Sequence, residues 1–230
     1  MSETQRVEAF SDGVFAIATT LLVLEIHVPS QHGHALTRAL ADQWPSYAAY
    51  VVSFLVIGVM WVNHHALFGY LARVDRTLIF LNLLLLMVVA ALPWPTALLA
   101  EHLRDPDDAR VAGVIYSTVM MVHAALYVAI WWYVTSRGHL LRAGVDRAAA
   151  RATRVRFNLG ALAYPATVAL ALVSPAVMLA AHGLMAVYYA FNHLALPDGD
   201  RPAAPADPGQ PGPSGQRQAE RPVSESPPLP

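Results

Sequence analysis

The first apolar stretch of this sequence opens with side chains that can ionise or form hydrogen bonds. Arg6, Ser11 and Asp12 lie within the string RVEAFSDG. From Val14 onward the stretch is almost entirely apolar. An ionisable group inside a lipid bilayer costs about 2.5–3.5 kcal/mol on insertion scales, so it needs a reason to be there. Either Ser11 or Asp12 caps the first turn of a helix, or the three residues form a polar network between helices.

A second polar group closes the second apolar stretch, where His64 and His65 are adjacent. Neighbouring residues of a helix point about 100° apart, so both imidazoles cannot easily ligate one metal without a further helix. A hydrogen bond to a neighbouring helix is the commoner role, and we expect no metal site. Asn82 lies in the third apolar stretch. Because successive membrane helices alternate in direction, Asp12, the histidines and Asn82 could meet at one depth.

The apolar part of the first stretch carries a stripe of bulky aliphatic residues. Ile17, Leu21 and Leu24 share one face of a helix, with Thr20 at its edge. Aliphatic residues at this spacing usually pack against another helix. The same spacing would also suit a pore lining, and periodicity alone favours packing.

The composition identifies the solvent that these elements require. The chain has 230 residues, of which 56% are hydrophobic and only 13% charged, and its mean hydropathy is +0.41. A soluble domain carries about 25% charged residues, so the bilayer is the natural solvent for this chain. The formal net charge of -1 gives nucleic-acid binding no electrostatic support. The absence of cysteine excludes disulfides and thiolate metal sites.

The pattern predicts an all-α integral membrane protein with six transmembrane helices. A bilayer core about 30 Å thick needs about 20 apolar residues per helix. Six stretches qualify: Ala9 to Val28, Pro45 to Tyr70, Asp75 to Ala100, Val111 to Thr135, Phe157 to Val173 and Pro175 to Leu196. Residues 1–196 therefore form the membrane domain. Residues 197–230 are rich in Pro, Gly, Ser, Asp and Glu, which predicts a disordered cytosolic tail.

The connections carry their own signals. Ser30 to Gln43 could form a small interfacial helix, and Ser136 to Arg156 is arginine-rich, which suggests a helix at the membrane surface. Pro93 and Pro95 interrupt or end the third helix, because proline removes a backbone hydrogen bond.

Arginine predicts the orientation, because the sequence contains no lysine. All but three of its 15 arginines fall on one side of the predicted topology. The exceptions are Arg38, Arg104 and Arg110. The positive-inside rule therefore predicts a multi-pass protein of the cell membrane with both termini in the cytosol.

The string Arg6-x-x-x-Phe10-Ser11-Asp12, continued by GVFAIA and Thr20, resembles the signature first helix of the transmembrane protein 175 family. This family comprises the lysosomal potassium channel and its bacterial relatives. Several later residues also resemble the pattern of the bacterial family members: Trp61-x-x-His64-His65, Asp75, Asn82 and Pro93-x-Pro95-Thr96. The resemblance is strong over about Arg6 to Thr96. From Val111 to Leu196 only the spacing of the helices agrees.

The resemblance implies a homotetramer in which the first helix of each subunit lines a central pore. By the family pattern, Ile17 forms the narrowest ring, and Thr20, Leu21 and Leu24 form the next layers. The implied structural network consists of Arg6, Phe10, Ser11, Asp12, His64, His65 and Asn82. Potassium ions, the lipid bilayer and further copies of the chain are then the partners, and no cofactor is expected.

An aliphatic ring is physically compatible with a potassium preference. Such a ring offers an ion no oxygen atoms, so it blocks permeation by dewetting when it is narrow. A slight dilation would admit a partly hydrated ion and favour potassium, which loses its water more cheaply than sodium. Thr20 hydroxyls could add partial coordination.

Two other classes of function remain open at this stage. A proton- or cation-coupled secondary transporter could use Asp12 and His64 or His65. Transporters usually place ionisable groups near the midplane on broken helices, whereas these groups lie toward one side. An intramembrane hydrolase would need catalytic residues, and the sequence has neither an HExxH nor a GxSxG motif, so we expect no enzyme.

Overall fold

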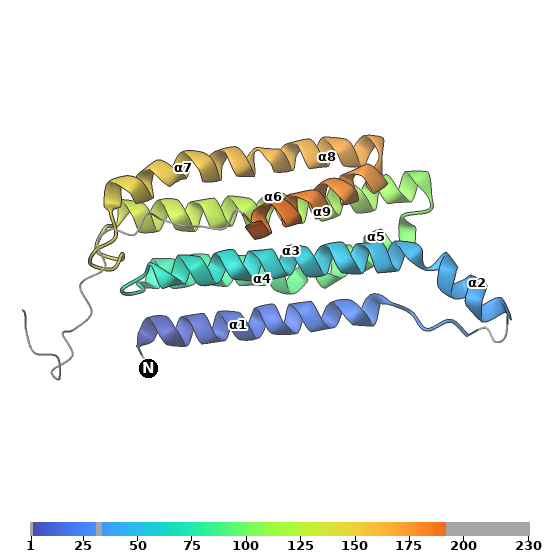
Figure 1. Cartoon of the computed structure of the whole chain (residues 1–230), viewed down its shortest axis with the longest axis horizontal. Coiled ribbons are helices and arrows are strands. Elements are labelled where there is room, and N and C mark those ends of the chain that lie inside the picture. Colours follow the sequence, from blue (N-terminus) through green and yellow to red (C-terminus); the bar gives the residue numbers. More distant parts are fainter. Residues whose placement is uncertain (1, 31–33, 192–230) are drawn as a thin grey trace, which may run out of the picture. The chain divides into compact units, whose positions relative to one another are not determined.

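The computed structural model describes residues 2–30 and 34–191, and these residues are almost entirely helical (Figure 1). Within these ranges there are nine α-helices and one 3-10 helix. They are α1 (Glu3–Leu21), the 3-10 helix η1 (Leu22–Glu25), α2 (His34–Asp42), α3 (Trp44–Gly69), α4 (Arg76–Ala91), α5 (Pro93–His102), α6 (Pro106–Ser136), α7 (Arg147–Ala161), α8 (Ala163–Val173) and α9 (Pro175–Phe191).

Short polar signals set the ends of these helices. Ser2 and Gln5 form a reciprocal capping box, so α1 begins at Glu3 rather than at the predicted Ala9. Asp75 accepts a hydrogen bond from the backbone N–H of Leu78 and caps α4. Aspartates also cap α6 and α7. Proline stands in the first turn of several helices, where its missing N–H costs nothing.

Four helical runs are long and apolar enough to cross a bilayer. They are Glu3–Glu25, Trp44–Gly69, Arg76–His102 and Pro106–Ser136. Two shorter apolar helices, α8 and α9, follow. The chain is therefore a multi-pass membrane protein with an all-α fold, as its sequence predicts.

The structure refines several predicted boundaries. The third run divides at Leu92 into α4 and α5, which confirms the interruption predicted from Pro93 and Pro95. The predicted interfacial helix after Ser30 is α2. The fifth helix begins at Arg147, not Phe157, because Asp146 caps it there. It therefore includes residues 147–156, so this part of the arginine-rich segment is helical as predicted, and it continues into α8 after Leu162. The predicted end of the sixth helix and the predicted tail, 197–230, lie outside the described residues.

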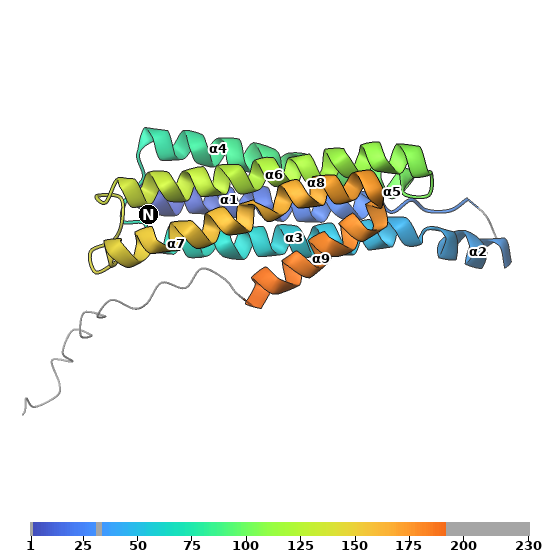
Figure 2. The same cartoon turned by 90° about the horizontal axis from the view of Figure 1, so that it is seen from above.

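The long helix α6 packs against α4, α5, α7, α8 and α9, and α3 packs against α5 and α9 (Figures 1 and 2). Fully buried Trp131, Tyr116 and Met120 of α6 form the centre of the core. Two connections at one end are also joined. The backbone N–H of Ala72 donates to the carbonyl of Leu140 at 2.8 Å, and that of Arg142 donates to Tyr70 at 3.0 Å. In contrast, α1 contacts mainly α3 and α4 and stands at the edge of the bundle.

Candidate functional site

Helix α1 has one buried face and one exposed face. Ser11, Phe15 and Ala18 are buried, and Leu22 continues this face into η1. The predicted stripe lies on the opposite face, where Ile17 is 61% exposed and Leu24 is 70% exposed. Successive residues of a helix point 100° apart, so these two sets of residues lie on different faces. One face attaches the helix to its own subunit, and the other is exposed.

The buried face is attached through a chain of hydrogen bonds across three helices. Ser11 donates its hydroxyl to the carbonyl of Val7 at 2.9 Å. The Asn82 amide of α4 donates to Ser11 Oγ at 3.0 Å, and its Oδ1 lies 2.8 Å from His64 Nε2 of α3. A carbonyl oxygen only accepts, so His64 donates through Nε2. Asn82 and His64 thus meet, as the topology predicts, but Ser11 joins them in place of the predicted Asp12.

Two further contacts join α1 to α3 beside this chain. Asp12 Oδ1 accepts a hydrogen bond from the Trp61 indole at 2.9 Å. Glu8 Oε1 lies 3.0 Å from His65 Nδ1. Glu8 and Asp12 are four residues apart, and so are Trp61 and His65, so each pair shares a helix face. The partners run in opposite order because α1 and α3 are antiparallel. These contacts fix the axial register of the two helices.

His64 is enclosed by aromatic rings. Its ring stacks on Phe68 at 4.5 Å between centroids and lies 5.3 Å from Phe15 of α1. The side chain is buried, and Nδ1 has no partner within the described chain. No group of three or more His, Asp or Glu residues that could hold a metal occurs in the part of the chain described. The geometry of His64 is that of a packing residue between α1, α3 and α4.

Two residues of the predicted network, Phe10 and Arg6, take no part in the Ser11–Asn82–His64 hydrogen bonds. Phe10 is 57% exposed and lies on the same side of α1 as Ile17. Arg6 is exposed and forms no ion pair among the described residues. Conversely, Glu8 and Trp61 carry contacts that the sequence reasoning did not assign. Their spacing of four residues from Asp12 and His65 was a usable signal.

Asp75 fixes the start of α4 and connects it to α6. It caps the helix through the Leu78 N–H, and its Oδ2 accepts a hydrogen bond from the Tyr133 hydroxyl at 2.7 Å. Burial acts to raise the pKa of Asp75, but these hydrogen bonds, with His139 and Arg137 nearby, hold that pKa below its usual value. Asp75 thus caps the third membrane helix and ties its start to α6.

A second polar cluster joins α3, α5 and α6 away from α1. Ser53 Oγ lies 3.0 Å from the Tyr116 hydroxyl, and Thr96 donates to Ser53 at 2.9 Å. All three residues are buried. Thr96 is part of the Pro93-x-Pro95-Thr96 string, so this string both divides the helix and attaches α5 to α3.

The free face of α1 is apolar and carries no charged group near Ile17. Thr20 turns its hydroxyl back to the carbonyl of Ile17 at 2.9 Å, which satisfies the hydroxyl within the helix. Ile17, Leu21 and Leu24 are all exposed. This face can either contact lipid or meet another copy of the chain, and an aliphatic ring built from several copies would be a narrow hydrophobic passage.

Comparison with known proteins identifies the relatives of this arrangement. The family model described as the endosomal/lysosomal potassium channel TMEM175 matches residues 6–93. A potassium channel of Streptomyces collinus is 63% identical over 198 residues, which cover 86% of this chain and 96% of that protein. The chain belongs to the TMEM175 family.

A solved structure supports the same assignment for the fold. The crystal structure of a TMEM175 homologue from Chamaesiphon minutus, described as a lysosomal potassium-selective channel homologue, superimposes with a TM-score of 0.74 at 40% identity. The match covers 85% of this chain and all of that one. A chicken TMEM175, named an endosomal/lysosomal proton channel, is 38% identical over 138 residues, which are 55% of this chain and 27% of that protein.

The TMEM175 family model covers the anchored part of the molecule. Residues 6–93 include α1, α3 and α4, and hence every contact of the Ser11–Asn82–His64 chain. The prediction that the chain is not an enzyme agrees with the names of its relatives, which are channels.

Proposed function

We propose that this chain is a potassium-preferring cation channel in which four copies place α1 around a common axis. Ile17 forms the narrowest ring, and Thr20, Leu21 and Leu24 form the neighbouring layers. Relatives named as potassium channels support the choice of ion. Potassium ions, lipid and further copies of the chain are the proposed partners, and no cofactor is required.

The division of α1 into two faces is the observation that carries the proposal. The buried face is tied to α3 and α4 by hydrogen bonds, while the Ile17 stripe contacts little of its own subunit. A helix that lines a pore must be attached to its own subunit on one face and leave the opposite face uncovered toward the pore axis. The polar contacts therefore act as the support of the pore helix and not as an ion pathway.

The aliphatic ring acts as a hydrophobic gate. It presents no oxygen ligands, so water leaves the narrow zone and ions are excluded when the ring is tight. A small rotation or dilation of α1 wets the zone and admits partly hydrated ions. Discrimination then follows the cost of dehydration, which favours potassium over sodium by a modest factor.

Flux through the purified full-length protein tests the channel class. In a planar bilayer held at a fixed voltage, the protein should pass potassium current at channel rates with no gradient of protons or sodium. The particle mass should correspond to four chains. Flux that requires an exchanged proton or cation would instead support the alternative, a coupled transporter using Asp12 and His64 or His65.

The orientation is also a proposal, with both termini in the cytosol of the producing cell. A tag placed after Pro230 should resist external protease in intact cells and be cleaved after permeabilisation. Cleavage in intact cells would contradict the proposed topology.

A further inference from the structure

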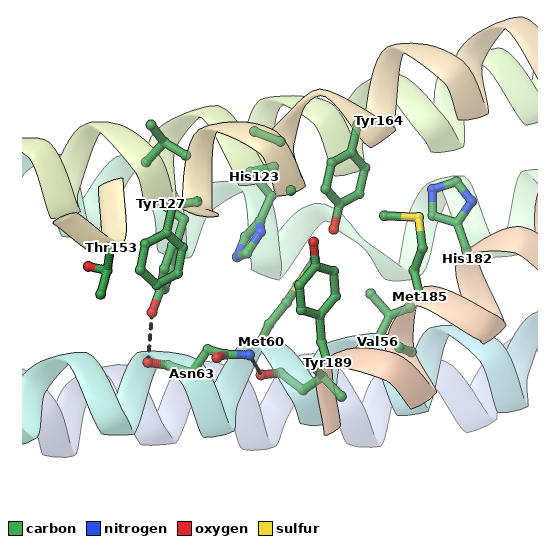
Figure 3. A pocket seen from close by; sticks show the side chains of 17 residues that line it. Val56, Met60, Asn63, His123, Tyr127, Thr153, Tyr164, His182, Met185 and Tyr189 are labelled. Atoms are coloured by element: carbon green, nitrogen blue, oxygen red, sulfur yellow. Dashed lines mark hydrogen bonds between the residues drawn. The ribbon is translucent and has the colours of Figure 1, made fainter. Parts of the chain in front are cut away.

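A cavity of about 120 Å³ lies between α3 and the helices α6 to α9, and no residue of α1 lines it. It is partly enclosed by α3, α6, α7, α8 and α9 (Figure 3). Its walls are mainly apolar and aromatic, with Met60, Tyr127, Phe157 and Met185 among them. No carboxylate or arginine lines it among the described residues. A charged ligand would therefore be left without a counter-charge.

His182 places an unused hydrogen-bond acceptor at this cavity. Its Nδ1 lies 3.0 Å from the carbonyl of Met178, and a carbonyl can only accept, so Nδ1 carries the proton. In the neutral ring Nε2 is then an acceptor. This atom is buried and has no donor in the described structure. The ring lies beside the aromatic faces of Tyr116 and Tyr164.

His123 supplies a second imidazole. It is 6% exposed, its Nε2 has no partner within the described ranges, and the side chain projects from α6 toward the space beside Tyr127 and Tyr189 (Figure 3). A buried polar atom that lacks a partner destabilises the folded protein by about 1–3 kcal/mol. A ligand that forms a hydrogen bond to this atom would offset that cost.

Three other polar side chains around the cavity already have partners in the protein. The Tyr127 hydroxyl donates to the carbonyl of Asn63 at 2.9 Å, and the Asn63 amide donates to Val59 at 2.9 Å. Thr153 donates to the carbonyl of Ala150 and accepts from the Trp131 indole. The two imidazoles differ from these three side chains because each has a buried ring nitrogen without a partner among the described residues.

A glycine shapes one wall of the cavity. A Cβ atom on Gly160 would lie 2.5 Å from the Tyr189 hydroxyl, so the absence of a side chain lets α9 place Tyr189 against α7. Figure 3 shows the hydroxyl ends of Tyr164 and Tyr189 facing each other across this wall. Aromatic walls of this kind favour edge-to-face contact with a ring.

We propose that this cavity binds a neutral, ring-sized aromatic molecule that carries a hydroxyl donor, which hydrogen-bonds to His123 or His182. The volume of about 120 Å³ is close to the roughly 150 Å³ of an apolar cavity that takes up benzene, and the incomplete enclosure leaves space for a substituent on the ring. The hydroxyl supplies the donor that His182 Nε2 lacks, and the ring fills the apolar space. This site is separate from α1 and does not depend on the proposed channel function.

The test uses two probes of the same shape, 4-fluorophenol and 4-fluorotoluene, and follows their binding to the purified full-length protein by ¹⁹F NMR. The phenol should bind saturably. Replacing the imidazoles singly, in His123→Phe and His182→Phe, should weaken phenol binding about three- to tenfold in at least one variant, and toluene binding less than twofold. Comparing the two probes in each protein cancels their different partitioning into detergent.

A cavity-filling variant locates the probes. Ala124→Phe should abolish the binding of both, and Ala161→Leu serves the same purpose if the first variant does not assemble by sizing chromatography. Unchanged phenol binding in an assembled filling variant would place the probe elsewhere and overturn the proposal. Absence of saturable binding, or equal weakening of both probes in the histidine variants, would also overturn it.

Discussion

The two halves of the molecule treat their buried polar residues differently. In the half formed by α1 to α5, Ser11, Asn82 and His64 pass hydrogen bonds from one helix to the next. In the half formed by α6 to α9, His123 and His182 each keep a ring nitrogen without a partner among the described residues, and both line a cavity. His64 also has one unpartnered nitrogen, but aromatic rings enclose it.

This difference indicates two roles for buried polar residues, which hold helices together in one half and can bind a ligand in the other. A polar group bonded on both sides rigidifies the helices that carry it, whereas an incomplete one adds cost unless something binds it. We infer that the first half uses its polar residues to hold the pore helix. The cavity lies against α3 but is lined by none of the three residues of that hydrogen-bond chain.

The largest expected effect is on stability and comes from breaking the hydrogen-bond chain. Asn82→Leu removes the amide that bridges α1 and α3. His64 Nε2 is left without a partner, and Ser11 Oγ keeps only its bond to the Val7 carbonyl. A buried polar group left without a partner costs about 1–3 kcal/mol. The variant should give much less assembled protein, and its melting temperature in a sizing assay should fall by several degrees.

His123→Leu is the matched control for that comparison. It also removes a buried polar side chain, but no described bond to His123 Nε2 is lost. Its melting temperature should change little or rise. If both variants lose stability equally, the distinction between the two halves is wrong.

A smaller effect is expected for the outer contact between α1 and α3. Asp12→Ala removes the acceptor for the Trp61 indole, which should cost about 0.5–1.5 kcal/mol. Trp61→Phe removes the donor of the same bond, so the two substitutions together should cost less than their sum. The thermal stability of the four proteins forms the cycle. Strict additivity, or an intact Asp12→Ala oligomer with altered ion selectivity, would argue against a purely supporting role.

The smallest effect concerns acid. The pKa of Asp75 is held below its usual value by hydrogen bonds from Leu78 and Tyr133. A depressed carboxyl pKa stabilises the folded state above the unfolded value of about 3.9, and this contribution is lost as the pH falls through the folded pKa. Acid unfolding monitored by circular dichroism should therefore be less steep below about pH 4 in Asp75→Asn. If the acid transition of Asp75→Asn is as steep as that of the unmodified protein, Asp75 adds no pH-dependent stability.

Much of this arrangement could be predicted from single residues. Pro93 and Pro95 locate the break between α4 and α5, and Asp75 locates the start of α4, because both act through local backbone chemistry. Asn82 and His64 could be placed at one depth because membrane topology fixes depth, but the partner from α1 was predicted as Asp12 and is its neighbour Ser11. The true start of α1 was also readable, since Ser2 and Gln5 have the spacing of a capping box.

Other features depend on tertiary contacts that one sequence does not contain. The pairing of Glu8 with His65 requires knowledge of which faces of α1 and α3 meet. The start of α7 at Arg147 was missed because the arginine-rich segment reads as a surface element. The cavity arises where five helices leave space between them, and neither His123 nor His182 differs in sequence from an ordinary packing histidine.

Substitution of Ile17 tests the central claim most directly. Ile17→Asn puts an amide on the free face of α1, and Met87→Asn puts one on an apolar face of α4 with nearly the same exposure, 61% against 63%. If the Ile17 stripe faces only lipid, both variants should lose stability alike, because an amide in hydrocarbon is costly. If Ile17 forms the ring, water at the axis satisfies the asparagines.

We therefore expect Ile17→Asn to stay assembled by sizing chromatography, to raise potassium conductance and to weaken the preference for potassium over sodium, with a smaller effect of the same kind for Leu24→Asn. Met87→Asn should lower stability and leave the selectivity of the surviving channels unchanged. Single-channel recording of assembled Ile17→Asn decides the question. Conductance and selectivity equal to those of the unmodified protein would contradict a constriction at Ile17.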